Sequence, residues 1–495
     1  MNAAKTSETN KTRCLDVAIV GAGFGGLGLA IRLKQNGIDN FRIFEQAEDV
    51  GGVWRDNRYP GITCDVPSHA YRFSFAPNPD WSRVCSSGEE ILAYMRATAE
   101  QHDIPSLIRF GEEVTRMEFT DGRWHLQTAS GFQADFNIVV TATGVLHHPV
   151  FPDIPGRDTF QGTCFHTARW QDDIDLTGKR VGIIGTGSTA IQMTGALVDT
   201  VAELKLFQRT AQWIWPLPNK EIPEDRKQAF RDSPEKLHLE YLKLTGRMND
   251  NFAAAVVGEN PEAYDLLARE CEEHLDVVTD PELRAKLTPD YKVGCKRLIM
   301  SDNFYQAIQR PNATLVTDPI AEFCPAGLRL ESGTMHELDV ILMATGFDTH
   351  RFFRPMEVIG PDGQSIEQAW EKQNQSYMTV AVPGFPNWFM IGGPSSPIGN
   401  FSWLLTAETQ FAYVLQLIER VRSQEGLALS PRAEPTAAYN AAIHDRLPET
   451  IWATGCSSWY IDAQGNIASW PWTFDKFVND LKSPDWADWQ HVKTG

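Results

Sequence analysis

The sequence predicts an α/β protein made of two strand–turn–helix units, the second inserted into the first, with an additional helical insert. Three observations predict this architecture. Two glycine turns, G-A-G-F-G-G from Gly21 and G-T-G-S-T-A from Gly185, each follow an apolar strand and precede a helical pattern. Each unit later ends in Ala-Thr-Gly, at residues 142–144 and 344–346. Residues 221–290 lack this pattern and are rich in Glu, Lys, Leu and Ala with helical periodicity.

The elements are expected in the following order. The first unit opens with strands over 15–20 and 41–46 around a helix over 27–34, and a later strand covers 136–144. The second unit repeats this order from residue 179, with strands over 203–210 and 338–348. The expected division is 1–145 and 344–495 for the first domain with a C-terminal cap, 150–220 and 291–343 for the second domain, and 221–290 for the helical insert.

The composition excludes several classes of protein. A chain of 495 residues is too long for one core, so two or three domains are expected. The net charge of −19, without any basic run, argues against binding to nucleic acid. No stretch reaches the roughly 18 apolar residues that suggest a membrane span. Residues 1–14 lack the apolar core of a secretory signal.

The cysteines show no pairing pattern. They stand at positions 14, 64, 85, 164, 271, 295, 324 and 456, and no C-x-x-C occurs. We therefore predict reduced thiols in a cytoplasmic protein, because disulfides are rare in that compartment. No metal site is predicted.

The residues that close the second strand of each unit carry opposite charges. Glu45 lies 24 residues after Gly21, and Arg209 lies 24 residues after Gly185. An acid at this place accepts hydrogen bonds from ribose hydroxyls, whereas an arginine binds a 2′-phosphate, which Thr210 would also contact. The glycines let backbone N–H groups approach a pyrophosphate. The sequence therefore predicts two Rossmann-like dinucleotide-binding domains, an NADP domain inserted into an FAD domain.

A chain that holds FAD and NADPH is expected to be a flavoprotein oxidoreductase. Its electrons could pass to a disulfide, to a carrier or to oxygen. Disulfide reductases of this build have a C-x-x-C or C-x-x-x-x-C redox pair. Cys64 has no such neighbour, since the next cysteine, Cys85, is 21 residues away. This branch is therefore disfavoured.

Residues 159–171 contain the pattern F-x-G-x-x-x-H-x-x-x-W at Phe160, Gly162, His166 and Trp170. Taken alone, these residues favour a satisfied buried histidine and a packing tryptophan. The pattern nevertheless resembles the fingerprint of the Baeyer–Villiger monooxygenases, flavin enzymes that insert an oxygen atom beside a ketone. That fingerprint usually continues with Pro or Asp, where this chain has Gln171. Related N-hydroxylating and flavin-containing monooxygenases have Tyr or Phe in place of the tryptophan.

A second motif supports the resemblance. G-G-V-W-R-D-N-R-Y-P-G-I-T-C-D, residues 51–65, matches the family pattern [A/G]-G-x-W-x-x-x-x-[F/Y]-P-G-x-x-x-D. Segments 67–82 and 456–460 look most similar to the hydroxyacetophenone-monooxygenase-like group. The resemblance implies a monooxygenase that uses FAD, NADPH and O2. It would convert a small-molecule ketone to an ester or lactone through a C4a-peroxyflavin.

The resemblance also implies roles for individual residues. Arg297 matches the arginine that stabilises the peroxide anion, and Asp65 matches the carboxylate that orients it. Phe160, Gly162, His166 and Trp170 would form a hinge between the domains. The implied FAD contacts are Gly21, Gly23, Phe24, Gly26, Glu45, Val53, Trp54, Asp56, Asp65, Tyr71 and Val114. The implied NADP contacts are Thr63, Gly185, Thr186, Gly187, Ser188, Thr189, Gln192, Arg209, Thr210, Lys296 and Arg297.

Two alternative functions are also compatible with the sequence. An N- or S-oxygenating flavin monooxygenase would not need the arginine, and a flavin-binding protein without turnover would need none of the chemistry. Trp459, Tyr460, Trp470 and Trp472 fit either an aromatic pocket wall or ordinary packing. The sequence predicts neither the particular ketone nor the oligomeric state.

Overall fold

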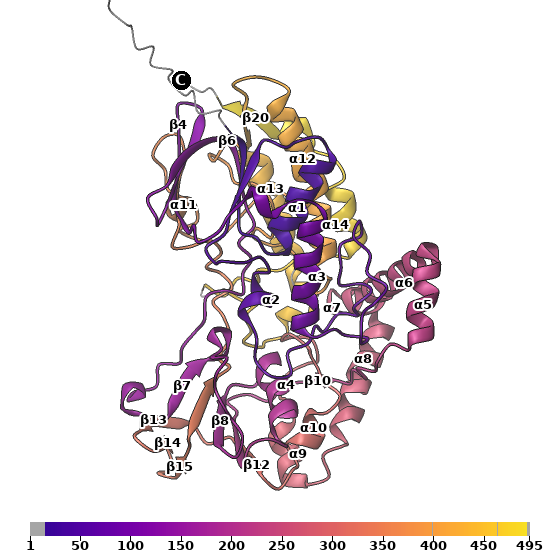
Figure 1. The fold of residues 1–495 in the computed structure, drawn as a ribbon, viewed down its shortest axis with the longest axis vertical. Helices are drawn as coiled ribbons and strands as arrows, with labels where there is room; N and C mark the ends of the chain where they lie inside the picture. The colour runs from indigo at the N-terminus through magenta and orange to yellow at the C-terminus, as the bar shows by residue number, and fades with distance from the viewer. Residues whose placement is uncertain (1–14, 398, 463, 493–495) are drawn as a thin grey trace, which may run out of the picture.

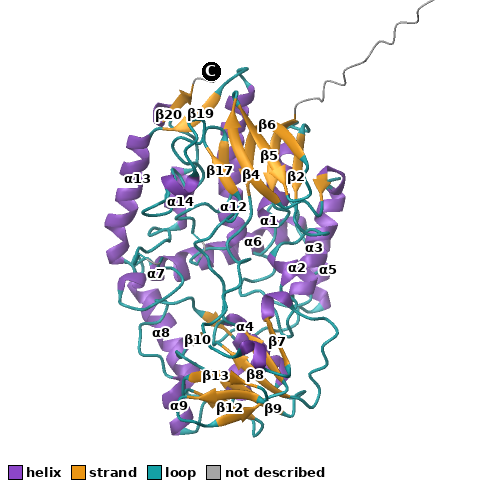
Figure 2. Cartoon of the chain, turned by 90° about the vertical axis from the view of Figure 1, so that its left-hand side faces the viewer, coloured by secondary structure: helices purple, strands orange, loops and turns teal. Residues whose placement is uncertain are grey.

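The computed structural model describes residues 15–397, 399–462 and 464–492. Residues 1–14, for which no secretory signal is expected, lie outside these ranges. Figure 1 shows that the indigo N-terminal residues and the orange and yellow C-terminal residues share one end of the molecule, whereas the magenta middle of the chain forms the other end. Figure 2 shows the large sheets at these two ends, with helices and loops between them. The second unit is thus inserted into the first, as the sequence predicts.

The first sheet has the strand order β17-β4-β5-β6-β1-β2-β3, and β18 also pairs with β6. Val17, Ala18 and Ile19 of the central β1 are fully buried, as expected for a parallel strand covered on both faces. Since β17 and β18 come from beyond residue 350, the chain completes this sheet only after it has built the second. The strands are β1 (Leu15–Val20), β2 (Phe41–Phe44), β3 (Ile108–Arg109), β4 (Val114–Thr120), β5 (Arg123–Thr128), β6 (Gln133–Thr141), β17 (Glu357–Ile359) and β18 (Trp388–Met390).

Helices from both ends of the chain pack beside this sheet. The helix α1 follows the first glycine turn, and α12 from the C-terminal part lies next to it (Figure 1). Phe411 of α12 approaches α1 so closely that a Cβ added at Gly28 would lie 2.4 Å from its ring. The helices of this unit are α1 (Phe24–Gln35), α2 (Val53–Asp56), α3 (Gly88–Gln101), α11 (Ile366–Ala369), α12 (Trp403–Arg422), α13 (Ala433–Arg446) and α14 (Phe474–Asp480). A separate two-stranded antiparallel sheet pairs β19 (Ala428–Pro431) with β20 (Trp489–Val492).

The second sheet is entirely parallel, with the order β12-β9-β8-β16-β7. Its strands are β7 (Thr163–His166), β8 (Arg180–Ile184), β9 (Glu203–Phe207), β12 (Ala313–Val316) and β16 (Val340–Met343). The helices α4 (Ser188–Leu197) and α10 (Phe304–Ala307) belong to this unit. Two smaller sheets pair β10 (Ile214–Trp215) with β11 (Ile299–Met300), and β14 (Gly327–Leu330) with β13 (Ile320–Cys324) and β15 (Met335–Glu337).

A helical segment interrupts the second unit between β10 and β11. Ser233, Asn260 and Asp280 each accept a backbone hydrogen bond at a helix N-terminus, and a proline follows each of them. Such N-caps with proline at the first helical position explain where these helices begin. The helices are α5 (Glu224–Asp232), α6 (Pro234–Arg247), α7 (Ala254–Val256), α8 (Pro261–Leu275) and α9 (Pro281–Leu287). The domain boundaries given above stay predictions.

One expectation about the cysteines is wrong. Cys295 and Cys456 form a disulfide across a sequence separation of 161 residues, with their Cα atoms 6.1 Å apart. No local spacing signals such a pair, because only the packing of the C-terminal segment against the second unit brings the two together. Five of the described cysteines are free thiols: Cys64, Cys85, Cys164, Cys271 and Cys324. Among the described residues, no helix has the length and apolar character needed to cross a membrane.

Candidate functional site

The two glycine turns have the same construction. Gly21 and Gly185 adopt φ values of 106° and 112°, which favour glycine. A Cβ at Gly21 would lie 2.7 Å from the Ala142 carbonyl oxygen, and one at Gly185 would lie 2.4 Å from that of Ala344. The Ala-Thr-Gly segment of each unit therefore packs directly against its own glycine turn, which explains why both motifs occur twice.

The other glycines of the two turns differ in the space around them: some are in close contact with neighbouring atoms, and others border open space. A Cβ at Gly26 would lie 1.8 Å from the Gly21 carbonyl oxygen, so glycine is needed for α1 to approach β1. Ala190 stands at the equivalent place in the second unit. By contrast, the nearest atom to a Cβ at Gly23 is 3.7 Å away, and none lies within 4 Å at Gly187. These two positions precede helix N-termini and leave the room that a pyrophosphate requires.

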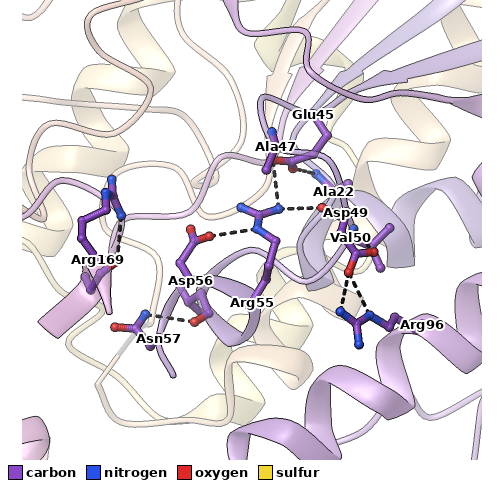
Figure 3. Close-up of polar contacts among 12 residues, drawn as sticks. Ala22, Glu45, Ala47, Asp49, Val50, Arg55, Asp56, Asn57, Arg96 and Arg169 are labelled. Atoms are coloured by element: carbon purple, nitrogen blue, oxygen red, sulfur yellow. Dashed lines mark hydrogen bonds and ion pairs between the residues drawn. The ribbon is translucent and has the colours of Figure 1, made fainter. Parts of the chain in front are cut away.

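Glu45 is held beside the first turn (Figure 3). Its carboxylate is buried and accepts hydrogen bonds from the Ala22 N–H at 2.8 Å, the Ala47 N–H at 3.0 Å and Arg55 at 3.1 Å. Arg55 also pairs with Asp56 at 2.8 Å, a contact that the sequence did not reveal. Because a carboxylate offers about four acceptor sites, Glu45 keeps capacity for a ribose hydroxyl.

Two cations lie near each other beside the second turn. Arg209 follows β9 and is exposed, and the Lys296 Nζ lies 4.7 Å from the centre of the Tyr291 ring. Burial lowers the pKa of Lys296, Asp290 opposes this shift, and the positive charge of Arg209 adds to it. Arg209 and Lys296 repel each other when no anion is bound. Together they would therefore favour binding of a dianion such as a 2′-phosphate. In the adjoining turn, the Thr186 hydroxyl donates to the Thr210 carbonyl at 2.8 Å.

The loop after α2 packs against the second unit. The Tyr59 hydroxyl donates to Gln192 of α4 at 3.1 Å, and the Gln192 side chain donates to the Thr63 carbonyl at 3.0 Å. Gly61 has a φ of 85°, and a Cβ there would lie 2.7 Å from the Gln192 carbonyl oxygen. This loop therefore joins the turn region of one unit to the first helix of the other. Ser188 and Thr189 begin the same helix.

Three of the implied flavin contacts lie together. The Trp54 indole N–H donates to the Tyr71 hydroxyl at 3.1 Å, and their ring centres are 5.6 Å apart. Phe24, the first residue of α1, meets the Tyr71 ring edge-on at 5.5 Å. Val53 and Asp56 are in α2 with Trp54, whereas Val114 is the first residue of β4 in the first sheet.

The implied catalytic pair is formed in the structure. Arg297 and Asp65 make an ion pair, with side chains that remain 31% and 25% exposed. The charge of Asp65 raises the pKa of Arg297 above its usual range, against the effect of burial. Arg297 is therefore permanently positive. Tyr460 contributes to the same rise in the pKa of Arg297, a link that sequence reasoning missed.

His166 ends β7 and is both buried and satisfied. Its Nδ1 accepts from the Ala168 N–H at 3.1 Å, so Nε2 carries the proton and donates to the Gly346 carbonyl at 3.2 Å. Burial lowers the pKa of His166 to about 4, which keeps it neutral near pH 7. Trp170 packs edge-on against Phe165 at 5.3 Å. These contacts match what the residues alone favour.

The fingerprint residues also contact the two crossings, which are the chain segments that lead from the first unit to the second and back. Val150 donates to the Gly346 carbonyl at 3.0 Å, so the outgoing and returning chain segments run together. The His166 ring contacts Phe151 at 5.5 Å and Phe347 at 5.8 Å, one from each crossing. At the other end of the fingerprint, a Cβ at Gly162 would lie 2.4 Å from the Asp339 carbonyl oxygen and 2.5 Å from the Phe160 ring.

The C-terminal aromatic residues have different surroundings: some pack in the interior, and one lines a cavity. Trp470 is fully buried and meets Trp472 edge-on at 4.9 Å, so it is a packing residue. Trp459 lines a cavity together with Thr349, His350 and Phe352. Within the described ranges, no three His, Cys, Asp or Glu side chains gather in a way that could hold a metal ion.

Known proteins resemble this chain over almost its whole length. Residues 18–243 match the family described as pyridine nucleotide-disulphide oxidoreductase. An uncharacterized monooxygenase of Mycobacterium tuberculosis is 45% identical over 460 residues, covering 93% of this chain and 92% of that protein. A Baeyer–Villiger monooxygenase of Streptomyces coelicolor is 39% identical over 484 residues, covering 96% and 92%.

Solved structures agree with these relatives. The complex of OTEMO with FAD and NADP has a TM-score of 0.87 and 26% identity, covering 97% of this chain and 99% of that one. Cyclohexanone monooxygenase with bound ε-caprolactone has a TM-score of 0.83 and 27% identity, covering 96% and 99%. The fold and the two nucleotide sites thus define an FAD- and NADPH-dependent monooxygenase. More narrowly, the chain belongs to the Baeyer–Villiger monooxygenases. Its place in the hydroxyacetophenone-monooxygenase-like group stays a prediction.

Proposed function

We propose that this protein uses NADPH and O2 to insert one oxygen atom beside the carbonyl of a small-molecule ketone, giving an ester or lactone. The ion pair of Arg297 with Asp65, at the meeting point of the two nucleotide-binding units, carries this proposal. The bound ε-caprolactone of a structural relative supports a cyclic ketone as one substrate class. The O2 requirement and a cytoplasmic location belong to the same proposal.

The residues present fit the two cofactors. Gly21, Gly23, Gly26 and Glu45 would hold the ADP part of FAD, because the turn leaves space for phosphates and the acid faces it. When bound, FAD and NADPH supply the electrons with which O2 is activated. The remaining contacts implied by the resemblance stay predictions: Phe24, Val53, Trp54, Asp56, Tyr71 and Val114 for FAD, and Thr63, Gly185, Thr186, Gly187, Ser188, Thr189, Gln192 and Thr210 for NADPH.

Arg297 would act through its fixed charge. A carbonyl that is attacked by an oxygen nucleophile gains negative charge, and a guanidinium held nearby stabilises it without reorganisation. Asp65 would orient the guanidinium, and both side chains are partly exposed, so the ion pair can face the reactants. His166, with Phe160, Gly162 and Trp170, would transmit movement between the units, since its ring touches both crossings.

The product distinguishes this function from its alternatives. We expect purified holoenzyme to consume NADPH and O2 with cyclohexanone and to release the lactone with one atom of isotope-labelled O2. A thioether is offered as a parallel substrate. Sulfoxide without lactone would favour the S-oxygenating alternative, and bound flavin without O2 uptake would favour a protein that lacks turnover.

Arg209→Ala should selectively weaken NADPH binding. Loss of one charge-assisted contact to a phosphate predicts a KM for NADPH that rises about 10- to 100-fold, while kcat and the KM for NADH change little. Steady-state kinetics with both nucleotides measure this. Arg310→Ala is a matched control, because Arg310 is an exposed arginine paired with Asp199. An unchanged KM for NADPH in Arg209→Ala would exclude the phosphate role.

A further inference from the structure

The loop that carries Asp65 is held by backbone hydrogen bonds on both sides of this residue. Before it, the Cys64 N–H donates to the Ser86 carbonyl at 3.0 Å. After it, the Ser68 N–H donates to the Val84 carbonyl at 2.7 Å. The position of the carboxylate in the first unit therefore depends on the chain segment that contains these two carbonyls.

The strand that follows Arg297 is held in the same way by the second unit. Arg297 stands two residues before β11, and Ile299 of β11 pairs with Ile214 of β10 in a parallel register. The Ser301 N–H donates to the Trp215 carbonyl at 3.1 Å. The backbone next to the guanidinium therefore depends on β10.

One stretch of chain, residues 213–222, joins these two supports, and we call it the connecting segment. It begins with β10, and its last residues run antiparallel to the segment that supports the Asp65 loop. The Val84 N–H donates to the Lys220 carbonyl at 3.0 Å. The Ile222 N–H donates to the Ser82 carbonyl at 2.8 Å. The connecting segment thus contacts the support of each member of the ion pair.

Asn219 makes the central contacts of the connecting segment. Its side-chain oxygen accepts from the Cys85 N–H at 2.9 Å, and its side-chain nitrogen donates to the Cys85 carbonyl at 2.9 Å, across 134 positions of sequence. Its backbone N–H donates to the Asp302 carboxylate, just beyond β11, at 3.2 Å. Pro216 and Pro218 restrict the backbone between β10 and Asn219, so the two supports are joined over a short and stiff distance.

The ion pair needs such support from its surroundings. Its side chains are 31% and 25% exposed, and ion pairs that water can reach contribute little to holding two parts of a protein together. Cys85, by contrast, is fully buried, so loss of the Asn219 amide would leave its N–H and carbonyl without these partners away from water. The contact of Asn219 with Cys85 is therefore the more costly one to break.

We propose that Asn219 is a positioning residue for the Arg297–Asp65 ion pair. By binding the backbone of Cys85, it fixes the second unit, which supplies the guanidinium, against the first unit, which supplies the carboxylate. The proposal rests on the proposed function, because the ion pair is the feature that would stabilise negative charge on the reacting ketone. Asn219 acts through the backbone around the pair and not on the substrate.

Asn219→Ala removes both hydrogen bonds to Cys85. We expect kcat for ester formation to fall about five-fold or more, while the KM for NADPH changes less than about two-fold and a larger share of NADPH oxidation ends in hydrogen peroxide. A crystal structure of the variant holoenzyme should show that Arg297 and Asp65 no longer form an ion pair. Amide hydrogen exchange in residues 62–68 and 82–87 should become faster, and this measurement does not depend on activity.

Asn312→Ala is the matched control. The Asn312 amide also donates two hydrogen bonds to backbone carbonyls, those of Val198 and Val201 at 2.8 and 3.1 Å, but both lie within the second unit. We expect this variant to keep the wild-type share of hydrogen peroxide and the wild-type exchange rates in residues 62–68. Flavin content and melting temperature show whether each variant is folded and loaded.

Asp302→Ala gives a second route to the same effect, because it removes the acceptor of the Asn219 N–H. Asp302→Asn is its control, since it keeps an oxygen acceptor there. The double variant Asn219→Ala/Asp302→Ala should lose less than the product of the two single losses, as expected for changes that act on one connection. Single losses that multiply fully would overturn the connection through Asp302.

The outcomes separate this proposal from the proposed function. If wild type forms ester while Asn219→Ala matches Asn312→Ala in kcat and peroxide release, the positioning role is refuted. It is also refuted if Asn219→Ala loses flavin or affinity for NADPH while Arg297 and Asp65 stay paired, because the residue then has only a structural role. If wild type forms no ester from any ketone, the proposed function itself fails.

Discussion

Arg297→Ala is expected to lower ester formation about 10²- to 10³-fold while NADPH oxidation continues. Arg297 carries a charge that cannot be titrated away, and Asp65 holds it in a fixed ion pair. Without it, negative charge that develops on the ketone oxygen has no preorganised partner. The electrons from NADPH should then be released to O2 as hydrogen peroxide. Product analysis together with a peroxide assay measures this division.

Arg297→Lys is the appropriate control, because it keeps one positive charge but loses the planar fork that binds Asp65. It should retain some ester formation, between wild type and Arg297→Ala. Flavin content and NADPH oxidation without ketone show that each variant is a loaded enzyme. Normal ester formation by Arg297→Ala would exclude this residue from the chemistry.

Gly26→Ala is expected to yield protein without FAD. The added Cβ would lie 1.8 Å from the Gly21 carbonyl oxygen, which belongs to the turn itself and cannot move as a side chain would. Helix α1 would have to shift away from β1, and the opening strand and turn of the FAD unit would be disrupted. The measured quantities are the ratio of flavin to protein after purification and the melting temperature.

Gly246→Ala controls for the substitution itself. Gly246 lies within α6, and no atom lies within 4 Å of a Cβ there. Alanine in a helix interior should stabilise the protein slightly, by about 0.5–1 kcal/mol, with full flavin content. A fully flavinylated, normally melting Gly26→Ala protein would contradict the close approach of α1 to the turn.

The repeated units could be predicted because their signals are local. Each glycine turn, its strand and its helix lie within about 20 residues, and backbone geometry decides which positions need glycine. The opposite charges of Glu45 and Arg209 could likewise be predicted, because each residue follows its glycine turn at the same short spacing. The Arg297–Asp65 pair was reachable only through family resemblance, since the two residues are far apart in the chain and neither is distinctive alone.

The sequence by itself determined the α/β class, the nesting of one nucleotide-binding unit in the other, and the preference for FAD and NADPH. These follow from strand hydrophobicity, turn glycines and single charges, which act over a few residues. Only the tertiary structure decided that Cys295 pairs with Cys456 and that Arg55 holds Glu45. The disulfide joins two residues that are 161 positions apart in the sequence. Tertiary packing alone brings such distant residues together, and no spacing pattern in the sequence predicts their contact.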